Sequence, residues 1–144
     1  MKHLDNNLWR GSRSEAIEFY NQNKQDHPMI ICFESGIYED LVNDDYERQD
    51  FGLALEEIPC SNFFPPSFKH VMRFLSLINQ YPDFKIFAHC LRGKDRTGYM
   101  IAAYRMKICG WSFEDSCAEM RANGFNTWLY WWWGFSLMKW ENKK

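Results

Sequence analysis

Short strand-forming runs that alternate with helical patterns constrain the fold of this chain more than any other feature. Residues 29–33 are apolar throughout, residues 53–58 are a second candidate strand, and residues 84–88 form a third, mostly apolar run of strand length. A strand without a polar face is typical of a parallel sheet that is covered on both sides. The alternation therefore predicts an α/β fold in which helices flank a mostly parallel central sheet, with ligands bound at the carboxyl ends of the strands.

The segments between these strands have helical patterns. Ser14 is expected to cap a helix that ends near residue 23, and the acidic stretch 38–49 is also predicted to be helical. Ser67 is expected to cap another helix, because apolar residues recur at spacings of three and four until Pro82 breaks the pattern.

The composition is that of a folded domain. Of the 144 residues, 46% are apolar and 25% are charged, which excludes the low hydrophobicity of a disordered chain. No repeat or linker interrupts the sequence, so we expect a single domain over residues 1–144. The net charge of −2 argues against a general nucleic-acid binder, and any recognition of phosphate must therefore be local.

Two features favour a soluble, cytoplasmic protein. Residues 1–9 contain no apolar targeting core, and no apolar stretch is long enough to span a membrane. The five cysteines are odd in number and include no Cys-x-x-Cys pair, which favours a reducing compartment over a disulfide scaffold.

The chemistry of the chain is concentrated in residues 89–98, which read HCLRGKDRTG and lie between the last predicted strand and a predicted helix over residues 97–108. A tight loop with Gly93 at its centre directs backbone N–H groups to one point, and the start of the helix adds partial positive charge. This arrangement predicts a site for a phosphoryl group. The guanidinium of Arg96 suits two phosphoryl oxygens, and the same field favours the thiolate of Cys90, which is a nucleophile.

The order His89, Cys90, five residues, Arg96, Thr97 and Gly98 resembles the signature of the cysteine-dependent protein tyrosine phosphatase superfamily. The GKDRTG ending resembles a small bacterial branch that acts on phosphotyrosine and phosphoinositides. Residues 8–12 (LWRGS) are similar to the opening strand of that family, and residues 110–114 are similar to a connection between two of its helices. The resemblance implies a phosphatase loop between the last strand and a helix.

The resemblance also implies roles for the catalytic residues. Cys90 attacks phosphorus to form a cysteinyl-phosphate, and Arg96 holds the equatorial oxygens. The hydroxyl of Thr97 would hydrogen-bond the thiolate, and His89 would hold the loop and help to keep Cys90 ionised. No metal or other cofactor is required.

The remaining residues of the loop are expected to bind substrate: Leu91, Arg92, Gly93, Lys94 and Gly98. The two glycines would serve backbone geometry and close approach. The cations of Arg92 and Lys94 favour substrates that carry more than one phosphate.

The general acid departs from the family pattern. Family members usually carry an Asp on a loop some thirty residues before the cysteine, and Asn62 stands there in this chain. An amide cannot donate that proton. Glu56 and Glu57 lie on a predicted strand, whereas Asp95 is within the loop, as in myotubularin-like phosphatases. We therefore expect Asp95 to be the general acid, with a capping role at the helix start as the alternative.

These residues predict a phosphomonoester hydrolase, with inositol phosphates or phosphoinositides slightly favoured over phosphotyrosine. Its partner would be a phosphorylated small molecule, a phospholipid headgroup or a phosphoprotein, and not a nucleic acid. The alternatives are a dedicated phosphotyrosine phosphatase, a phosphate-binding pseudophosphatase and a rhodanese-type sulfurtransferase. Cys60 is expected to be a packing residue, with a protective disulfide to Cys90 as the alternative.

Seven of the residues in the segment 126–144 are aromatic, and five of them are tryptophans. A terminal helix that packs some of these rings and exposes the rest is the expected structure. A dimer contact and an anchor at a membrane surface are the alternatives that Trp favours, and the sequence leaves them open.

Overall fold

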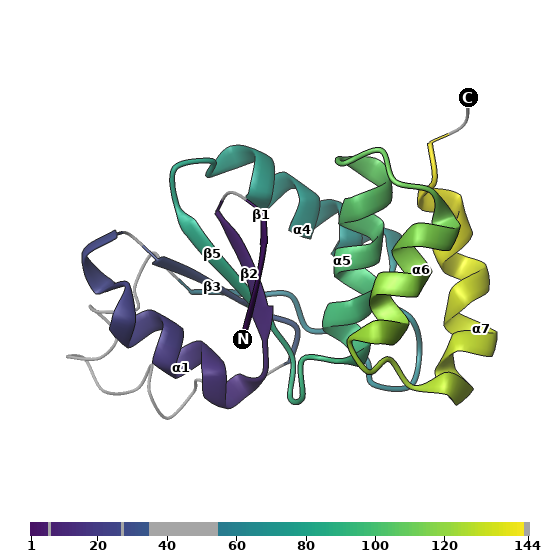
Figure 1. Cartoon of the computed structure of the whole chain (residues 1–144), viewed down its shortest axis with the longest axis horizontal. Helices are drawn as coiled ribbons and strands as arrows, with labels where there is room; N and C mark the ends of the chain where they lie inside the picture. The colour runs from purple at the N-terminus through teal and green to yellow at the C-terminus, as the bar shows by residue number, and fades with distance from the viewer. Residues whose placement is uncertain (6, 27, 35–54, 143–144) are drawn as a thin grey trace.

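The fold is built on one mixed sheet. The computed structural model describes residues 1–5, 7–26, 28–34 and 55–142. Within these residues the sheet has five strands in the order β1-β2-β5-β3-β4 (Figure 1). The strands are β1 (Lys2–Asp5), β2 (Leu8–Gly11), β3 (Pro28–Cys32), β4 (Leu55–Glu57) and β5 (Lys85–His89). Only the β1–β2 pair among them is antiparallel, so the predicted mostly parallel sheet is confirmed.

Helices cover both faces of this sheet, as predicted (Figure 1). They are α1 (Arg13–Gln22), α4 (Phe68–Gln80), α5 (Asp95–Lys107), α6 (Phe113–Ala122) and α7 (Thr127–Leu137), with short 3-10 turns η1 (Lys24–Asp26) and η2 (Met138–Trp140). α1 packs on one face, where Phe19 meets Phe87 of β5. α4 and α5 share the larger core on the other face, and α6 and α7 pack against α5.

The predicted buried strands lie within a residue or two of their observed positions. The run 29–33 became β3, and all five residues of that strand are buried. The run 84–88 became β5, shifted by one residue so that His89 ends the strand. β4 lies within the predicted segment 53–58. The helix predicted over residues 38–49 lies outside the described residues.

Two helix starts differ from the prediction. Ser12, not Ser14, caps α1, because Ser12 follows β2 with extended backbone and its side chain accepts the N–H of Glu15, whose own side chain accepts the N–H of Ser12. α5 begins at Asp95, two residues before the predicted Thr97, and therefore takes Arg96 into its first turn. Ser67 caps α4 as predicted, through the N–H of His70.

β1 was missed altogether. Its sequence, KHLD, has no apolar run, and its residues are exposed or only half-buried. It forms because the antiparallel edge of β2 supplies hydrogen bonds, and local hydrophobicity gives no sign of that partner. None of the described helices is long and apolar enough to cross a bilayer.

The core beneath the site depends on Phe74 of α4, which is fully buried and packs edge-on against Phe33 with ring centroids 5.3 Å apart. We expect Phe74→Ala to lower the free energy of unfolding by about 3–5 kcal/mol, because it leaves a cavity that the sheet cannot close. Urea denaturation measures this loss. Ile17→Ala on the exposed side of α1 is the control and should change stability by less than about 0.5 kcal/mol. Equal effects of the two changes would contradict the assigned core.

Candidate active site

The predicted loop lies at the carboxyl end of β5. Cys90 follows the strand directly, residues 91–94 form the turn, and Asp95 starts α5. A pocket of about 190 Å³ opens beside the loop, and its lining residues are Asn62, Cys90, Leu91, Arg92, Asp95 and Arg96. The structure therefore brings together the predicted nucleophile, the predicted arginine and both positions considered for the acid.

The backbone of the loop packs directly on the junction between β2 and α1. Gly93 has φ of 70°, and a Cβ at this position would lie 2.3 Å from the carbonyl oxygen of Gly11. Only glycine permits both the left-handed conformation and this approach. The N–H of Arg13 donates to the carbonyl of Leu91 at 3.2 Å, which fixes the first half of the turn.

Arg10 of β2 supports the loop from below. Its side chain is 2% exposed, and Nη2 donates to the carbonyl of Gly93 at 2.9 Å. Burial lowers the pKa of Arg10, while the carboxylate of Glu119 and the Cys90 sulfur oppose that shift by favouring the cation. The guanidinium thus binds the carbonyl side of the loop and places a positive charge near Cys90.

Arg96 is held by oxygen acceptors from two strand ends. Nη2 lies 3.4 Å from a carboxylate oxygen of Glu34, and Nη1 donates to the carbonyls of Phe33 and Cys60 at 3.5 and 3.4 Å. Glu34 is itself buried and also binds Arg13, at 3.0 Å from Nη2. One carboxylate therefore orients the pocket arginine and ties it to α1.

His89 is fully buried behind Cys90, and its Nδ1 lies 3.3 Å from the Cys90 carbonyl. A carbonyl only accepts hydrogen bonds, so Nδ1 carries the proton in this contact. Burial lowers the pKa of His89 from 6.5 to about 4, so the ring is neutral at pH 7. His89 therefore holds the loop by hydrogen bonding and not by charge.

The bond predicted between Thr97 and Cys90 is not formed in the described structure. The Thr97 hydroxyl is buried and has no hydrogen-bond partner among the described residues. Cys60 is a free thiol, like the four other cysteines, all of which lie in the described part of the chain. Burial raises the pKa of Cys60 to about 12, so this thiol stays protonated.

Asp95 and Asn62, the two positions considered for the general acid, both line the pocket but come from different elements. Asp95 lines the pocket, and its Oδ1 accepts the backbone N–H of Asn126 at 2.8 Å, which joins the loop to the start of α7. Asn62 lines the same pocket from the loop before α4. Glu56 lies on β4 as predicted and pairs with Arg73 of α4 at 2.7 Å.

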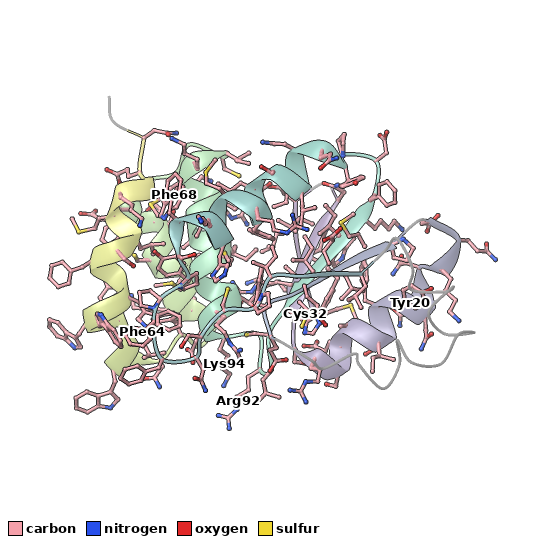
Figure 2. All side chains as sticks on the ribbon, turned by 180° about the vertical axis from the view of Figure 1, so that it is seen from behind. Tyr20, Cys32, Phe64, Phe68, Arg92 and Lys94 are labelled. Atoms are coloured by element: carbon pink, nitrogen blue, oxygen red, sulfur yellow. The ribbon has the colours of Figure 1, made fainter. Side chains whose placement is uncertain are left out.

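The loop cations are placed differently from each other. Arg92 lines the pocket, and Figure 2 shows its side chain pointing outward at the same end of the molecule as Lys94. The aliphatic part of Lys94 lies against Gly124, where an added Cβ would be 3.1 Å from Cδ. Gly98 allows α5 to approach α6, because a Cβ there would lie 3.2 Å from Met120.

Among the described residues, one cluster has atoms suited to a metal. Ligand atoms of Cys32, Glu34 and His89 lie within 4.8 Å of one another, and all three residues are buried. The carboxylate of Glu34 already pairs with two arginines, and burial raises the pKa of Cys32 to about 12. A cation would have to displace two guanidinium groups and a thiol proton, so the donor set fits the ion pairs better than a metal.

Sequence reasoning missed three residues that shape the site, namely Arg10, Arg13 and Glu34. Arg10 lies within the segment 8–12 that resembled an opening strand and Arg13 directly follows it, and their charge in or beside a strand was the signal available. Glu34 follows directly after the apolar run 29–33, at the carboxyl end of a predicted strand, where parallel sheets place functional groups.

The chain matches known proteins in both sequence and structure. The family model described as "DSP-PTPase phosphatase fused to NAD+ Kinase" matches residues 3–127. An mRNA-capping enzyme of Caenorhabditis elegans is 27% identical over 67% of this chain and 17% of its own length. The phosphatidylinositol 3,4,5-trisphosphate 3-phosphatase and protein-tyrosine-phosphatase PTEN1 of Arabidopsis thaliana is 26% identical over 60% of this chain and 22% of its own. The chain thus spans about a fifth of the length of these curated relatives.

Two solved structures share the fold. Tk-PTP in its active form has a TM-score of 0.72 and 19% identity, over 96% of this chain and 92% of that chain. The core catalytic domain of the PP-IP phosphatase SIW14 from S. cerevisiae has a TM-score of 0.68 and 21% identity, over 86% of this chain and 75% of that chain. At these identities the likeness establishes the fold, which is the α/β fold predicted.

The buried His89 predicts a dependence of stability on pH. The unfolded chain binds a proton at this residue near pH 6.5 and the folded chain only near pH 4, so stability falls as pH drops through this window. The contribution lost is about 3 kcal/mol. We expect His89→Asn, whose amide keeps a donor for the Cys90 carbonyl, to lose less stability than wild type on acidification. Urea denaturation at both ends of the window measures the difference, and parallel losses would contradict a neutral buried His89.

Proposed function

This chain belongs to the family whose model is described as "DSP-PTPase phosphatase fused to NAD+ Kinase", which is of the cysteine-dependent protein tyrosine phosphatase type. We propose that the chain hydrolyses phosphomonoesters, and that its substrates are inositol phosphates or phosphoinositides with Cys90 as the nucleophile. The observation that carries the proposal is the convergence of Cys90, Arg96 and Arg92 on one pocket at a helix start. A phosphoryl group is the ligand that suits such a set.

In the proposed reaction the Cys90 thiolate attacks phosphorus, the bond from phosphorus to the leaving oxygen breaks, and a cysteinyl-phosphate forms. Arg96 holds two phosphoryl oxygens through this step, and Glu34 keeps its guanidinium in place. A water molecule then attacks the phosphorus, which releases inorganic phosphate and the thiolate. The buried hydroxyl of Thr97 is available to stabilise the departing sulfur in this second step.

The proposed proton donor is Asp95. A carboxyl group donates its proton from one oxygen while the other accepts a hydrogen bond, so the bond from Asn126 to Oδ1 orients the group without preventing donation. Asp95 also lies in the pocket with Cys90, within the loop that would cradle the phosphoryl group. Asn62 faces the same pocket and supplies an amide that binds a leaving group without protonating it.

Two observations support an inositol substrate over phosphotyrosine. Arg92 lines the pocket next to Arg96, so a second phosphate on the same substrate would find a cation. The name of one similar protein specifies a PP-IP phosphatase, and the name of another specifies a phosphatidylinositol 3,4,5-trisphosphate 3-phosphatase that is also a protein-tyrosine-phosphatase. Phosphate release from inositol phosphates, phosphoinositides and phosphotyrosine peptides tests the preference, and faster turnover of the peptides would overturn it.

The nucleophile is tested by Cys90→Ser. We expect turnover of every substrate to be lost while inorganic phosphate still binds, because the loop N–H groups and Arg96 remain. Phosphate-release kinetics and calorimetric titration measure the two effects. Cys109→Ser is the matched control, since this half-buried thiol lies outside the pocket, and it should keep wild-type rates. More than a few per cent of wild-type turnover in Cys90→Ser would reject the proposed intermediate.

The acid is tested by comparing leaving groups. An inositol hydroxyl needs protonation as it leaves and para-nitrophenolate does not, so Asp95→Asn should cost roughly 10²–10⁴ in kcat on inositol phosphates and much less on para-nitrophenyl phosphate. Equal losses on both substrates would assign Asp95 a structural role through Asn126. Asn62→Asp is the complementary change. A tenfold rise or more in its turnover of inositol phosphates would move the acid to the loop before α4.

A further inference from the structure

One face of α7 is apolar and exposed. Trp128, Trp131 and Phe135 of α7 recur at spacings of three and four, and Met138 at the start of η2 continues the row; their exposed fractions are 86, 72, 77 and 53%. The opposite face carries the fully buried Trp133, which packs on the core. Residues 125–138 contain no charged side chain. Helix α7 is thus apolar all round, although only one side of it is covered.

This exposed face continues to the mouth of the pocket. Phe63 and Phe64 are each 61% exposed, directly follow the pocket residue Asn62, and pack edge-on against Trp132 with ring centroids 5.1 and 5.5 Å away. The indole N–H of Trp133 donates to the carbonyl of Phe63 at 3.0 Å, so this loop is fixed to α7. The pocket therefore opens beside a rim of exposed aromatic rings.

Charge is distributed unevenly along α7. The end near the pocket carries Arg92 and Lys94 of the loop, and Arg121, whose guanidinium lies 4.8 Å from the ring centre of Tyr130. The carboxylate at that end, Asp95, is bound by the N–H of Asn126. The other end carries the acids Glu114, Asp115 and Glu141, together with Lys139.

We propose that the pocket end of α7 docks on the surface of an anionic lipid bilayer. Trp128, Trp131 and Phe64 would enter the boundary between headgroups and acyl chains, where Trp and Phe are stable. Arg92 and Lys94 would face lipid phosphates, and the pocket would open toward the headgroups. The headgroup as a source of substrate rests on the proposed function, whereas the docking itself does not.

The charges at the pocket end suit an anionic bilayer. In a symmetric dimer a parallel pair of α7 helices would bring these cations against each other, whereas an antiparallel pair would bring them to the acids of the other end, so the oligomeric state is measured beside the vesicle binding. An anionic membrane instead offers the opposite charge to the same end of the helix where the most exposed tryptophan lies. Since no described helix is long enough to span a membrane, the contact would be confined to the surface.

The experiment is co-sedimentation of the whole chain with vesicles of phosphatidylcholine and phosphatidylserine, against vesicles of phosphatidylcholine alone. Neither contains a phosphoinositide, so catalysis plays no part. We expect binding to the anionic vesicles that falls about tenfold or more in the double variant Trp128→Ser, Trp131→Ser. Ile17→Ser, on an exposed site of α1 at the other side of the molecule in Figure 1, should bind like wild type.

Charge is tested separately with Arg121→Gln, which should weaken binding to anionic vesicles about fivefold. Hydrolysis of para-nitrophenyl phosphate should be unchanged in the double variant, which shows that its pocket is intact. Equal binding by wild type and double variant, or no binding at all, would overturn the inference. It would also be overturned if wild type were a dimer that the tryptophan changes dissociate, as measured by sedimentation velocity. Vesicle binding by a chain that hydrolyses no phosphoester would reject the proposed function and leave the docking standing.

Discussion

The close packing of the loop backbone at Gly93 on the backbone of Gly11 is the constraint on which the site depends. A Cβ added at Gly93 would lie within 2.4 Å of two backbone atoms of Gly11. The two backbone segments are therefore in direct contact, and no side chain fits between them. The parallel pairing of β2 with β5 ends at the partners Gly11 and His89, and this brings the two turns together. Arg10 then bonds to the carbonyl of Gly93 and fixes the direction in which that turn points.

The same packing determines where charge is placed. Besides Arg92 in the turn itself, three arginines lie around this loop, namely Arg10, Arg13 and Arg96. Glu34 compensates two of them with a single buried carboxylate. Removing one partner of such a group leaves the others uncompensated, so these residues act as a unit and not as separate contacts. The arrangement keeps Arg96 oriented toward the pocket without neutralising the loop itself.

The sequence was sufficient for features that depend on local pattern. Buried strands such as 29–33 are visible as apolar runs, and Ser67 is visible as a cap, because both signals involve neighbouring residues. The loop from His89 to Gly98 is visible because its chemistry requires specific residue types at fixed spacing. Glu34, Arg10 and β1 were missed because each acquires its role from a distant partner: Arg96, Gly93 and β2 respectively. Ser12 and not Ser14 caps α1 because β2 ends at Gly11, and the residue at which a strand ends cannot be read from local pattern.

Helix α7 is connected to the pocket at two separate points. The indole N–H of Trp133 binds the loop that carries Asn62, and the N–H of Asn126 binds the carboxylate of Asp95. Both positions considered for the acid are therefore held by the same element. A shift of the first turn of α7 would therefore move the carboxylate of Asp95 as well, because one hydrogen bond joins the two. A surface that covers the aromatic face of this helix therefore lies one hydrogen bond away from the Asp95 side chain and one from the loop that carries Asn62.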